Sequence, residues 1–509
     1  MVTHPPSLPQ AFVDVLQRTP DKRFVRFEGR DYSYAQMYDA VARVAGALVA
    51  GGLEPADRVA LYLENSPSFI ASYLGVLWTG GIVVPVNTRY ARSEVEHIIG
   101  DAGVRLLVCD RAGQERVAGV DVERTLVLDH DFGTDLTRWA AFAAGDPQPD
   151  PVALAQTDLA VIGYTSGTTG RSKGAMLSHG NFCSNSAAVT EAWGWTADDD
   201  LLLVLPLFHM HGLGVGLHGT VMRGSSLTLH RRFDAPTVLD CLRRDTVSMF
   251  FGVPTMYARL VAEAADHPFA TPPDRLRLLV SGSAPLSPQR HADVERVFGL
   301  RILERYGMTE TVMNTGNPYH GERKPGSVGL PFAGVEVRIA DIESGAVLSE
   351  GETGEVQLCG PNVSRGYWRN PGATQASFTA DGWFKTGDLG YRDADGYYYL
   401  SGRAKELIIS GGFNVYPREI EEVLGTHPAI ADVAVLGLPD DDLGEIVVAA
   451  VVGNASLADI SLEEVQALCR DTLASFKKPR RVYHVTELPR NALGKVQKHR
   501  LRDELLSRS

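Results

Sequence analysis

RVALYLENSPSFIASYLGVLWTGGIVVPVN, residues 58–87, is the stretch that sets the class of fold. The apolar run at 58–63 predicts a buried strand, residues 66–81 predict a helix ending at two glycines, and residues 82–87 predict a second strand. A helix at 93–103 and a strand at 105–110 are predicted next. Strands that alternate with helices pair in parallel through crossover helices, so the sequence predicts an α/β fold.

Further along the chain this alternation returns and then ends. Residues 276–306 predict strand, helix and strand, whereas residues 326–400 hold short, glycine-punctuated runs of β-forming residues. Because 509 residues exceed what one hydrophobic core usually serves, we predict two domains, residues 1–402 and residues 403–509. In the second domain we expect a helix at 418–425, strands at 430–438 and 445–452, and a helix at 462–476.

Composition indicates an ordinary soluble enzyme. The chain is 44% hydrophobic and 22% charged, and its net charge of −13 predicts no bulk attraction to nucleic acid or to an anionic membrane. The N-terminal stretch lacks a signal-peptide pattern, and the apolar runs are far shorter than the ~20 residues of a spanning helix. Five scattered cysteines without CxxC spacing favour reduced thiols and a cytoplasmic protein.

A polar, glycine-rich loop follows the apolar run at 159–163. It reads YTSGTTGRSKG (164–174) and combines small residues, hydroxyl side chains and Lys173. Successive backbone N–H groups in such a loop make a nest for an anion, and the hydroxyls and the lysine add donors and charge. The spacing differs from the G-x-x-x-x-G-K-[ST] loop of GTPases. We expect this loop to hold a polyphosphate, and we expect a turn and a helix after it.

Three other patterns are weaker. GVGLHG (214–219) matches G-x-G-x-x-G, but PLFHMH separates it from the preceding apolar run, so we expect no dinucleotide site. His209 and His211 have no further ligands at zinc spacing, so we expect no zinc. GYTSG (163–167) misses the hydrolase nucleophile pattern by one position.

Four further segments carry functional residue types. YGMTE (306–310) follows a predicted strand, and open parallel sheets bind ligands at such strand ends. KTGDLG (385–390) places an Asp between glycines, which suits it to accept hydrogen bonds from ribose hydroxyls. GRAKELIISGGFNVYPREIEEVL (402–424) joins the predicted domains, and PRNALGKVQK (489–498) carries a lysine on a glycine-containing turn. Residues 470–502 hold ten Lys or Arg against two acidic residues, which favours either a solvated surface or a cationic face toward a polyphosphate.

Taken in this order, the motifs resemble those of the adenylate-forming superfamily of acyl-CoA synthetases, luciferases and peptide-synthetase adenylation domains. The resemblance covers nearly the whole chain. It implies a large N-terminal domain of stacked αβ subdomains and a β-rich subdomain, followed by a small, mobile α+β C-terminal domain. It also implies the chemistry: a carboxylate attacks the α-phosphate of Mg-ATP, giving an acyl-adenylate and pyrophosphate, and a thiol then displaces AMP.

The resemblance assigns roles at the nucleotide. The glycine-rich loop would cradle the β- and γ-phosphates, Tyr306 would lie along the adenine, Asp388 and Arg403 would hold the ribose, and Glu310 would bind Mg²⁺. The implied nucleotide-binding set is Thr165, Ser166, Gly167, Thr168, Thr169, Gly170, Lys173, Ser283, Ala284, Tyr306, Gly307, Thr309, Asp388, Arg403 and Lys495.

It also assigns roles in catalysis and in domain movement. Lys495 would bridge the attacking carboxylate and the α-phosphate, Thr309 would contact the α-phosphate, and His209 would gate the acyl pocket. Lys405 would be the hinge about which the small domain rotates, so that Lys495 leaves and the thiol enters. The implied CoA-binding residues, along the pantetheine channel, are Gly411, Gly412 and Phe413.

The identity of the carboxylate depends on Arg305. Residues 303–329, and VPTMYARL (253–260) with Arg259, closely resemble malonyl-CoA synthetases. A guanidinium beside the acyl pocket would bind a second carboxylate bidentately, although internal pairing with Glu304 stays open. The implied acyl-pocket set is Arg305, Arg259, His209, Ser281 and Met308.

We therefore expect an AMP-forming acid–thiol ligase that uses ATP, Mg²⁺ and coenzyme A on malonate or methylmalonate. The alternatives are a medium- or long-chain fatty acid, another short acid, or transfer to a separate carrier protein. The resemblance also makes Lys495 a target for a lysine acetyltransferase, because acetylation removes the charge. The oligomeric state stays open.

Overall fold

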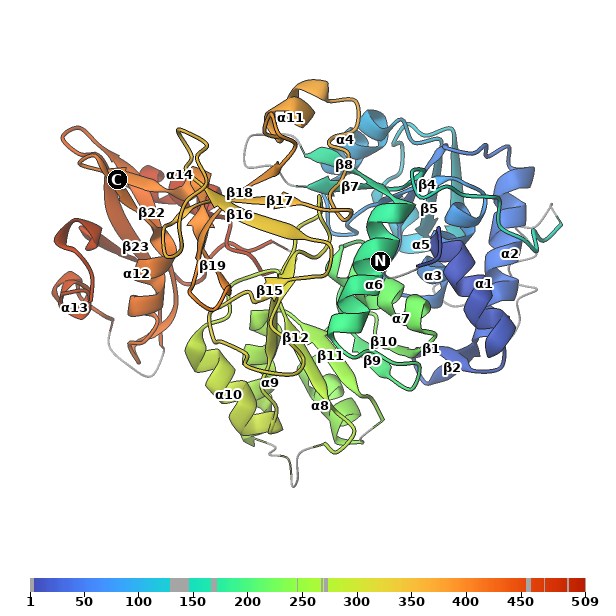
Figure 1. The fold of residues 1–509 in the computed structure, drawn as a ribbon, viewed down its shortest axis with the longest axis horizontal. Coiled ribbons are helices and arrows are strands. Elements are labelled where there is room, and N and C mark those ends of the chain that lie inside the picture. The colour runs from blue at the N-terminus through green and yellow to red at the C-terminus, as the bar shows by residue number, and fades with distance from the viewer. Residues whose placement is uncertain are drawn as a thin grey trace.

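The computed structural model describes residues 4–128, 146–165, 172–244, 246–266, 269, 273–454, 459–470, 472–491 and 494–508. They form a large N-terminal domain and a small C-terminal domain that lie side by side, the latter orange to red in Figure 1. The predicted α/β fold with two domains is confirmed, whereas the split at residues 402/403 stays a prediction. Among the described residues, no helix is both long and apolar enough to cross a bilayer.

The stretch at 58–87 folds as predicted. Its strand–helix–strand order is β3 (Arg58–Tyr62), α3 (Pro67–Trp78) and β4 (Ile82–Pro85), and the predicted helix and strand that follow are α4 (Arg92–Ala102) and β5 (Leu106–Asp110). The hydroxyl of Ser66 accepts from the Phe69 N–H at the start of α3, where Pro67 fits because its missing N–H has no helical partner. This sheet has the order β6 (Arg124–Leu128), β5, β3, β4, β7 (Leu159–Thr165) and β8 (Lys173–Ser178).

A second, larger sheet completes the αβ part of the large domain. Its order is β15 (Leu330–Pro331), β14 (Thr315–Gly316), β13 (Leu303–Tyr306), β12 (Leu278–Ser281), β11 (Met249–Gly252), β9 (Asp200–Leu203), β10 (Ser226–Leu229), β1 (Arg23–Phe27) and β2 (Arg30–Ser33). From β13 to β1 the pairing is parallel. The carboxyl ends of β12 and β13 therefore lie together, and the loops that follow them meet at one edge.

Helices of the large domain lie around these two sheets (Figure 1). Besides α3 and α4 they are α1 (Leu8–Arg18), α2 (Tyr34–Ala50), α5 (Arg111–Arg116), α6 (His179–Ala192), a π-helix (His211–Leu217), α7 (His218–Arg223), α8 (Ala235–Arg243), α9 (Pro254–Asp266), α10 (Pro288–Phe298) and α11 (Pro371–Ala376). The π-helix and α7 contain GVGLHG, which is thus helical and does not form a loop after a strand.

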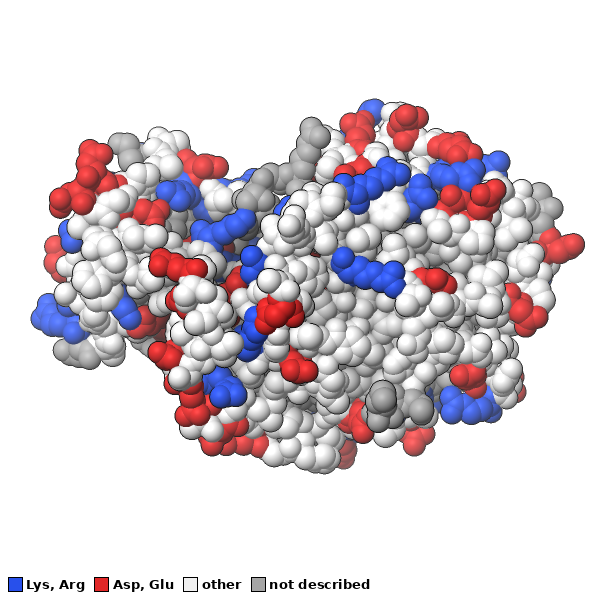
Figure 2. Space-filling model, turned by 45° about the horizontal axis from the view of Figure 1, so that its top comes forward, with Lys and Arg blue, Asp and Glu red and all other residues white. Residues whose placement is uncertain are grey.

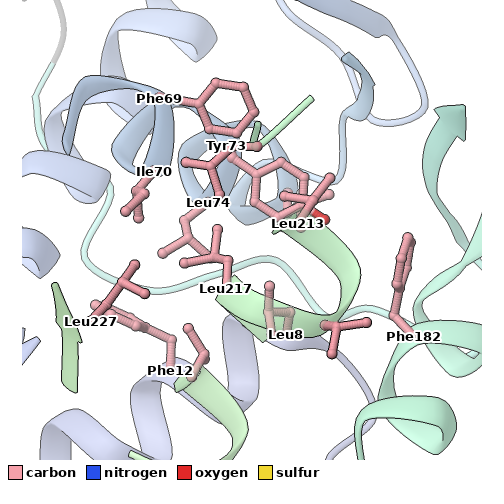
Figure 3. Packing of buried hydrophobic residues seen from close by; sticks show 14 of the residues in the cluster. Leu8, Phe12, Phe69, Ile70, Tyr73, Leu74, Phe182, Leu213, Leu217 and Leu227 are labelled. Carbon is pink, nitrogen blue, oxygen red and sulfur yellow. The ribbon is translucent and has the colours of Figure 1, made fainter. Parts of the chain in front are cut away.

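The main core lies where helices from distant parts of the chain meet. In Figure 3, Leu8 and Phe12 of α1, Phe69 and Leu74 of α3 and Leu217 of the π-helix are members of one buried cluster. Leu8 and Leu74 are at most 2% exposed, and each such side chain contributes about 1.5–3 kcal/mol through burial. This packing holds the π-helix, and with it the segment from His209 onward, in a fixed position.

The β-rich segment predicted at 326–400 forms an antiparallel sheet. Its order is β16 (Glu336–Ala340), β17 (Gly354–Cys359), β18 (Phe384–Arg392) and β19 (Tyr398–Arg403). In the C-terminal domain the order is β21 (Phe413–Val415), β20 (Ile408–Ser410), β23 (Gly444–Gly453) and β22 (Ile430–Asp440), with β24 (Arg481–His484) on β23. The helices there are a 3₁₀ turn (Ala404–Glu406), α12 (Pro417–Leu424), α13 (Leu462–Leu468), a second 3₁₀ turn (Ser475–Lys477) and α14 (Lys498–Ser507).

Two local predictions were wrong. The turn expected after Lys173 is the strand β8, because residues 173–178 pair with β7 and find a second partner in the segment around Tyr367. The helix expected at 462–476 ends at Leu468, since beyond it the chain turns so that Cys469 and Leu473 enter the core of the small domain. In both cases tertiary packing overrode a weak local preference.

Candidate active site

The base of the glycine-rich loop is a β-hairpin. Thr165 at the end of β7 and Lys173 at the start of β8 are direct cross-strand partners. Ser166, Gly167, Thr168, Thr169 and Gly170 lie outside the described residues. The Nζ of Lys173 lies 5.2 Å from the centre of the Tyr367 ring, a cation–π distance.

The loop after β13 lies against this hairpin. A Cβ on Gly163 of β7 would be 2.7 Å from Cγ2 of Thr309, so the two segments touch closely. Gly307 has no room for a side chain, because a Cβ there would be 2.0 Å from the Val312 carbonyl oxygen. Glu310 is only 5% exposed, and its carboxylate accepts a hydrogen bond from the Tyr367 hydroxyl at 2.9 Å.

Tyr306, Asp388 and Arg403 form one hydrogen-bonded group. The Tyr306 hydroxyl donates to Asp388, and the other carboxylate oxygen of Asp388 lies 2.7 Å from Nε of Arg403. Asp388 and Arg403 face each other across β18 and β19. Burial, followed by the Asp388 charge, raises the pKa of Tyr306, so its hydroxyl stays protonated. Tyr306 and Asp388, two predicted site residues 82 positions apart, are thus brought together.

Lys495 of the small domain enters the same region. The turn that carries it docks on the large domain, since a Cβ on Gly494 would lie 3.0 Å from Oγ1 of Thr255 in α9. Surrounding protein lowers the pKa of Lys495 although its side chain keeps solvent contact. Arg403 and Arg305 add to this lowering, while Asp388 and Glu310 oppose it. Figure 2 shows Lys and Arg side chains gathered along the hollow where the two lobes meet.

Arg305 is a buried cation with few partners. It is 3% exposed, its Nη2 donates to the Ser283 hydroxyl at 3.3 Å, and its Nε has no hydrogen-bond partner. In the described part of the chain no carboxylate lies within ion-pair distance of the Arg305 guanidinium. Glu304 points the other way, because its carboxylate accepts from the Leu286 N–H and lies 3.5 Å from His291. Burial lowers the pKa of Arg305 to about 9.

Further unpaired polar groups surround Arg305. Oγ of Ser283 lies 3.4 Å from Nδ1 of His211, and burial lowers the pKa of His211, which is therefore neutral. Burial and the charges of Lys495 and Arg305 lower the pKa of His209 to about 3. The buried atoms without a partner here include Nε2 of His211, Nδ1 of His209 and Oγ of Ser281. Ser283 itself has a φ of +69°, a left-handed conformation that costs a serine of order 1 kcal/mol.

Sequence reasoning missed two of these residues. His211 was considered only as a zinc ligand, and Tyr367 was not considered. The GYW stretch around Tyr367 has no pattern that reveals a contact with a carboxylate 57 positions away. The unusual second histidine of PLFHMH was the available signal for His211.

Other residues predicted for the site lie at the margin of this group of side chains or outside it. Ala284 and Met308 are half-buried beside Ser283 and Thr309. Arg259 is exposed on α9, and nothing in the described residues brings it to Arg305. Lys405 is exposed in the 3₁₀ turn between the domains.

The predicted CoA-binding residues and the basic segment occupy the surface of the small domain. Gly411, Gly412 and Phe413 form an exposed turn, where the Phe413 ring stacks on Phe476 with centroids 4.5 Å apart. Several cations of the basic segment pair with acidic residues of this domain, as in Lys477–Glu419, Arg490–Asp432, Lys498–Glu421 and Arg502–Glu445. These four cations are paired within the small domain, whereas Lys495 faces the large domain.

Comparison with known proteins identifies the family. Residues 12–368 match the AMP-binding enzyme family and residues 419–495 match the AMP-binding enzyme C-terminal domain. The chain is 35% identical to an oxalate–CoA ligase of Arabidopsis thaliana over 95% of this chain and 96% of that protein. It is 34% identical to a malonate–CoA ligase of the same plant, over 95% and 86%. Other relatives are named for feruloyl-CoA and for long-chain fatty acids.

Comparison with solved structures gives the same family. ATP-bound MatB from Rhodopseudomonas palustris is 40% identical, with a TM-score of 0.90 over 98% of this chain and 99% of that one. An o-succinylbenzoate–CoA synthetase from Bacillus subtilis, in complex with ATP and magnesium, is 30% identical with a TM-score of 0.86 over 99% and 100%. The chain thus belongs to the AMP-binding enzyme family, within the adenylate-forming superfamily. It is an acid–thiol ligase of the CoA-ligase type.

Proposed function

We propose that this enzyme activates malonate or methylmalonate, forming an acyl-adenylate from ATP and then the CoA thioester with release of AMP and pyrophosphate. ATP, Mg²⁺ and CoA follow from the family and from its relatives. Two carboxylates separated by one carbon form the substrate class. One carboxylate would react at the α-phosphate, and the other would bind in the pocket beside Arg305.

The proposed nucleotide site uses groups that are already in place. Thr165 and Lys173 would support the loop that holds the β- and γ-phosphates, and Glu310 would hold Mg²⁺ with a carboxylate that has no cation partner among the described residues. The Tyr306–Asp388–Arg403 group would hold the adenine and ribose. Side chains that are already held in position can stabilise the charge that develops at phosphorus, because they need not reorganise during the reaction.

The proposed catalytic, gating and hinge roles also use side chains near the nucleotide site or between the domains. Lys495 would place its charge between the attacking carboxylate and the α-phosphate, with Thr309 donating beside it. The neutral His209 lies near both Lys495 and Arg305, which fits a gate between the nucleotide and the acyl pocket. Lys405 would absorb the rotation that removes Lys495 and brings Gly411, Gly412 and Phe413 toward the thiol.

The observation that carries the substrate assignment is the unpaired guanidinium of Arg305. A buried cation without a counter-ion is costly, and an alkyl chain beside it would leave it unpaired. A second substrate carboxylate would pair with it and restore its ordinary pKa. The unpaired atoms on His211 and Ser281 would give that carboxylate further partners. These features favour a short dicarboxylate over a fatty acid.

The test compares acids that differ in the second carboxylate. We expect Arg305→Met to lower kcat/KM for malonate by about 100-fold or more, because removing one member of a buried charge pair costs roughly 2–5 kcal/mol. Butyrate turnover, measured by pyrophosphate release, should stay within a few-fold of its original value. Equal losses for the two acids would refute the dicarboxylate pocket.

Two comparisons complete the design. Arg244→Met removes an exposed arginine that pairs with Asp240 in the preceding turn of its helix, so turnover of neither acid should change. Measuring each acid with CoA and without it separates a free-thiol acceptor from a carrier protein. A carrier-dependent enzyme would form acyl-adenylate and release no AMP on addition of CoA.

A further inference from the structure

Tyr367 lies between two groups of the proposed ATP site. Its hydroxyl donates to Oε1 of Glu310 at 2.9 Å, and its ring faces Nζ of Lys173 at 5.2 Å. The two partners come from separate parts of the chain, the phosphate-loop hairpin and the loop after β13. Tyr367 is thus a side chain that touches both the lysine proposed for phosphate and the carboxylate proposed for magnesium.

The backbone around Tyr367 fixes this position. The Met176 N–H donates to the Gly366 carbonyl at 2.9 Å, and the Trp368 N–H donates to the Gly174 carbonyl at 2.8 Å, so residues 366–368 continue the hairpin sheet beyond β8. On the other side, the Ser364 N–H donates to the backbone carbonyl of Glu310 at 2.8 Å. The segment therefore holds the two loops at a set separation, and Tyr367 is the side chain that spans it.

The hydroxyl of Tyr367 has the chemistry of a fixed donor. Next to an ionised carboxylate, which only accepts hydrogen bonds, the tyrosine hydroxyl is the donor. Because the Tyr367 hydroxyl donates its hydrogen bond to Oε1, the other carboxylate oxygen of Glu310, Oε2, is left for another ligand. Among the described residues Glu310 has no cationic partner. The tyrosine thus orients the carboxylate and does not neutralise it, which leaves its charge for a divalent cation.

We infer that Tyr367 is a positioning residue for the magnesium of Mg-ATP. It holds Glu310 in the rotamer that presents one oxygen to the metal, and its ring keeps Lys173 beside the same phosphates. This inference rests on the proposed roles of Glu310 and Lys173. Tyr367 contacts both Glu310 and Lys173, but only its hydroxyl contacts Glu310. Loss of the hydroxyl alone should therefore weaken metal binding first.

The experiment measures metal binding directly. Mn²⁺ serves as the probe, titrated by electron paramagnetic resonance into the enzyme with α,β-methylene-ATP, which cannot transfer its adenylyl group. We expect Tyr367→Phe, which keeps the ring beside Lys173, to weaken Mn²⁺ binding by about 10-fold or more, as other partners of metal ligands do. In turnover assays the required Mg²⁺ concentration should rise equally, and excess Mg²⁺ should restore the rate with KM for the acid unchanged.

Two reference variants make the result decisive. Tyr34→Phe removes a buried hydroxyl that donates to the Ser225 carbonyl far from this site, and it should leave Mn²⁺ binding unchanged. Glu310→Gln should weaken Mn²⁺ binding at least as much as Tyr367→Phe does. If Glu310→Gln weakens binding and Tyr367→Phe does not, the role of Tyr367 is refuted while the proposed function stands.

The remaining outcomes also count against the inference. If neither variant changes Mn²⁺ binding, the metal role proposed for Glu310 fails and takes the role of Tyr367 with it. If Tyr367→Phe slows turnover by the same factor at every Mg²⁺ concentration and leaves Mn²⁺ binding intact, the tyrosine is only structural. A double variant should show less than the summed effect of the two single variants, because the residues act as one unit.

Discussion

Nη1 of Arg418 donates a hydrogen bond to the carbonyl of Leu400 at 2.6 Å, joining α12 of the small domain to β19 of the large one. Arg418 is 8% exposed, and its Nε is paired with Glu422 of the same helix. The two residues lie on opposite sides of the predicted boundary at 402/403. If the small domain rotates about Lys405 as proposed, this hydrogen bond would break, so it would favour the orientation in which Lys495 faces the proposed nucleotide site.

We expect Arg418→Met to slow adenylation more than thioester formation. A hydrogen bond from a charged group contributes about 1.5–3 kcal/mol, which changes the ratio of the two orientations roughly 10- to 100-fold. Single-turnover measurements would follow each half-reaction, the second one starting from supplied acyl-adenylate. Arg508→Met, which removes an exposed pair with Glu504, is the control. Equal slowing of both half-reactions would show that the contact does not select an orientation.

Lys495→Ala should lower the rate of adenylation by roughly 100-fold or more, on the scale of losing a preorganised donor. Thioester formation from supplied acyl-adenylate should survive. Only the protonated amine can stabilise the α-phosphate. Because the pKa of Lys495 is lowered, the rate of adenylation should fall with rising pH sooner than the ordinary lysine value of 10.5 implies. Lys495→Arg, if active, should move that fall to higher pH.

We propose that the same charge makes Lys495 a point of control. Its side chain keeps solvent contact, so a lysine acetyltransferase supplied with acetyl-CoA should modify it. Acetylated enzyme should lose adenylation and retain the second half-reaction, as Lys495→Ala does. Full activity after complete acetylation of Lys495 would contradict both the regulatory proposal and the catalytic role.

Gly163→Ala should disturb Thr309 without touching a charged group. The new Cβ would lie 2.7 Å from Cγ2 of Thr309, and β7 cannot retreat because it is paired with β4 and β8. Displacement of a substrate-positioning group by a fraction of an ångström to 1 Å should lower the rate of adenylation about 10- to 100-fold. Gly100→Ala on α4 is the matched control, since its Cβ meets nothing within 4 Å. A normal rate for Gly163→Ala would place Thr309 outside the reaction.

Buried histidines should make the enzyme less stable in mild acid. His179 is 1% exposed, neither of its ring nitrogens has a hydrogen-bond partner among the described residues, and burial lowers its pKa from 6.5 to about 4. Between these values the unfolded chain binds a proton that the folded chain does not. The free energy of unfolding therefore decreases as the pH is lowered, by at most about 3 kcal/mol from this residue.

His179→Phe should flatten that dependence between pH 6.5 and 4 in urea unfolding, because the site no longer titrates. Substitution of the exposed His320 by Gln should leave the slope as it is in the original enzyme. If His179→Phe keeps the full slope, other groups cause the acid sensitivity.

The sequence alone was sufficient for the elements whose signals are local. The period of apolar residues, with two glycines at the end of the stretch 66–81, predicted α3 and α4 between parallel strands, and this part of the fold is confirmed. The ordered motifs of the adenylate-forming superfamily then identified the family and pointed to Tyr306, Asp388, Arg403 and Lys495 before any contact was known. Local patterns and motifs suffice here because caps, periodicity and short motifs lie within a few residues of one another.

Only the tertiary structure decided which side chains meet and which lack a partner. That Arg305 has no carboxylate partner among the described residues, that Arg259 is exposed, and that Tyr367 bridges Lys173 and Glu310 all depend on segments tens to hundreds of residues apart. The strand β8 likewise formed where a turn was expected, because besides its hairpin partner β7 it gains a second partner, the segment around Tyr367, that is distant in sequence. Pairing and burial of charge are properties of the packed molecule, and they are what distinguish a dicarboxylate pocket from an apolar one.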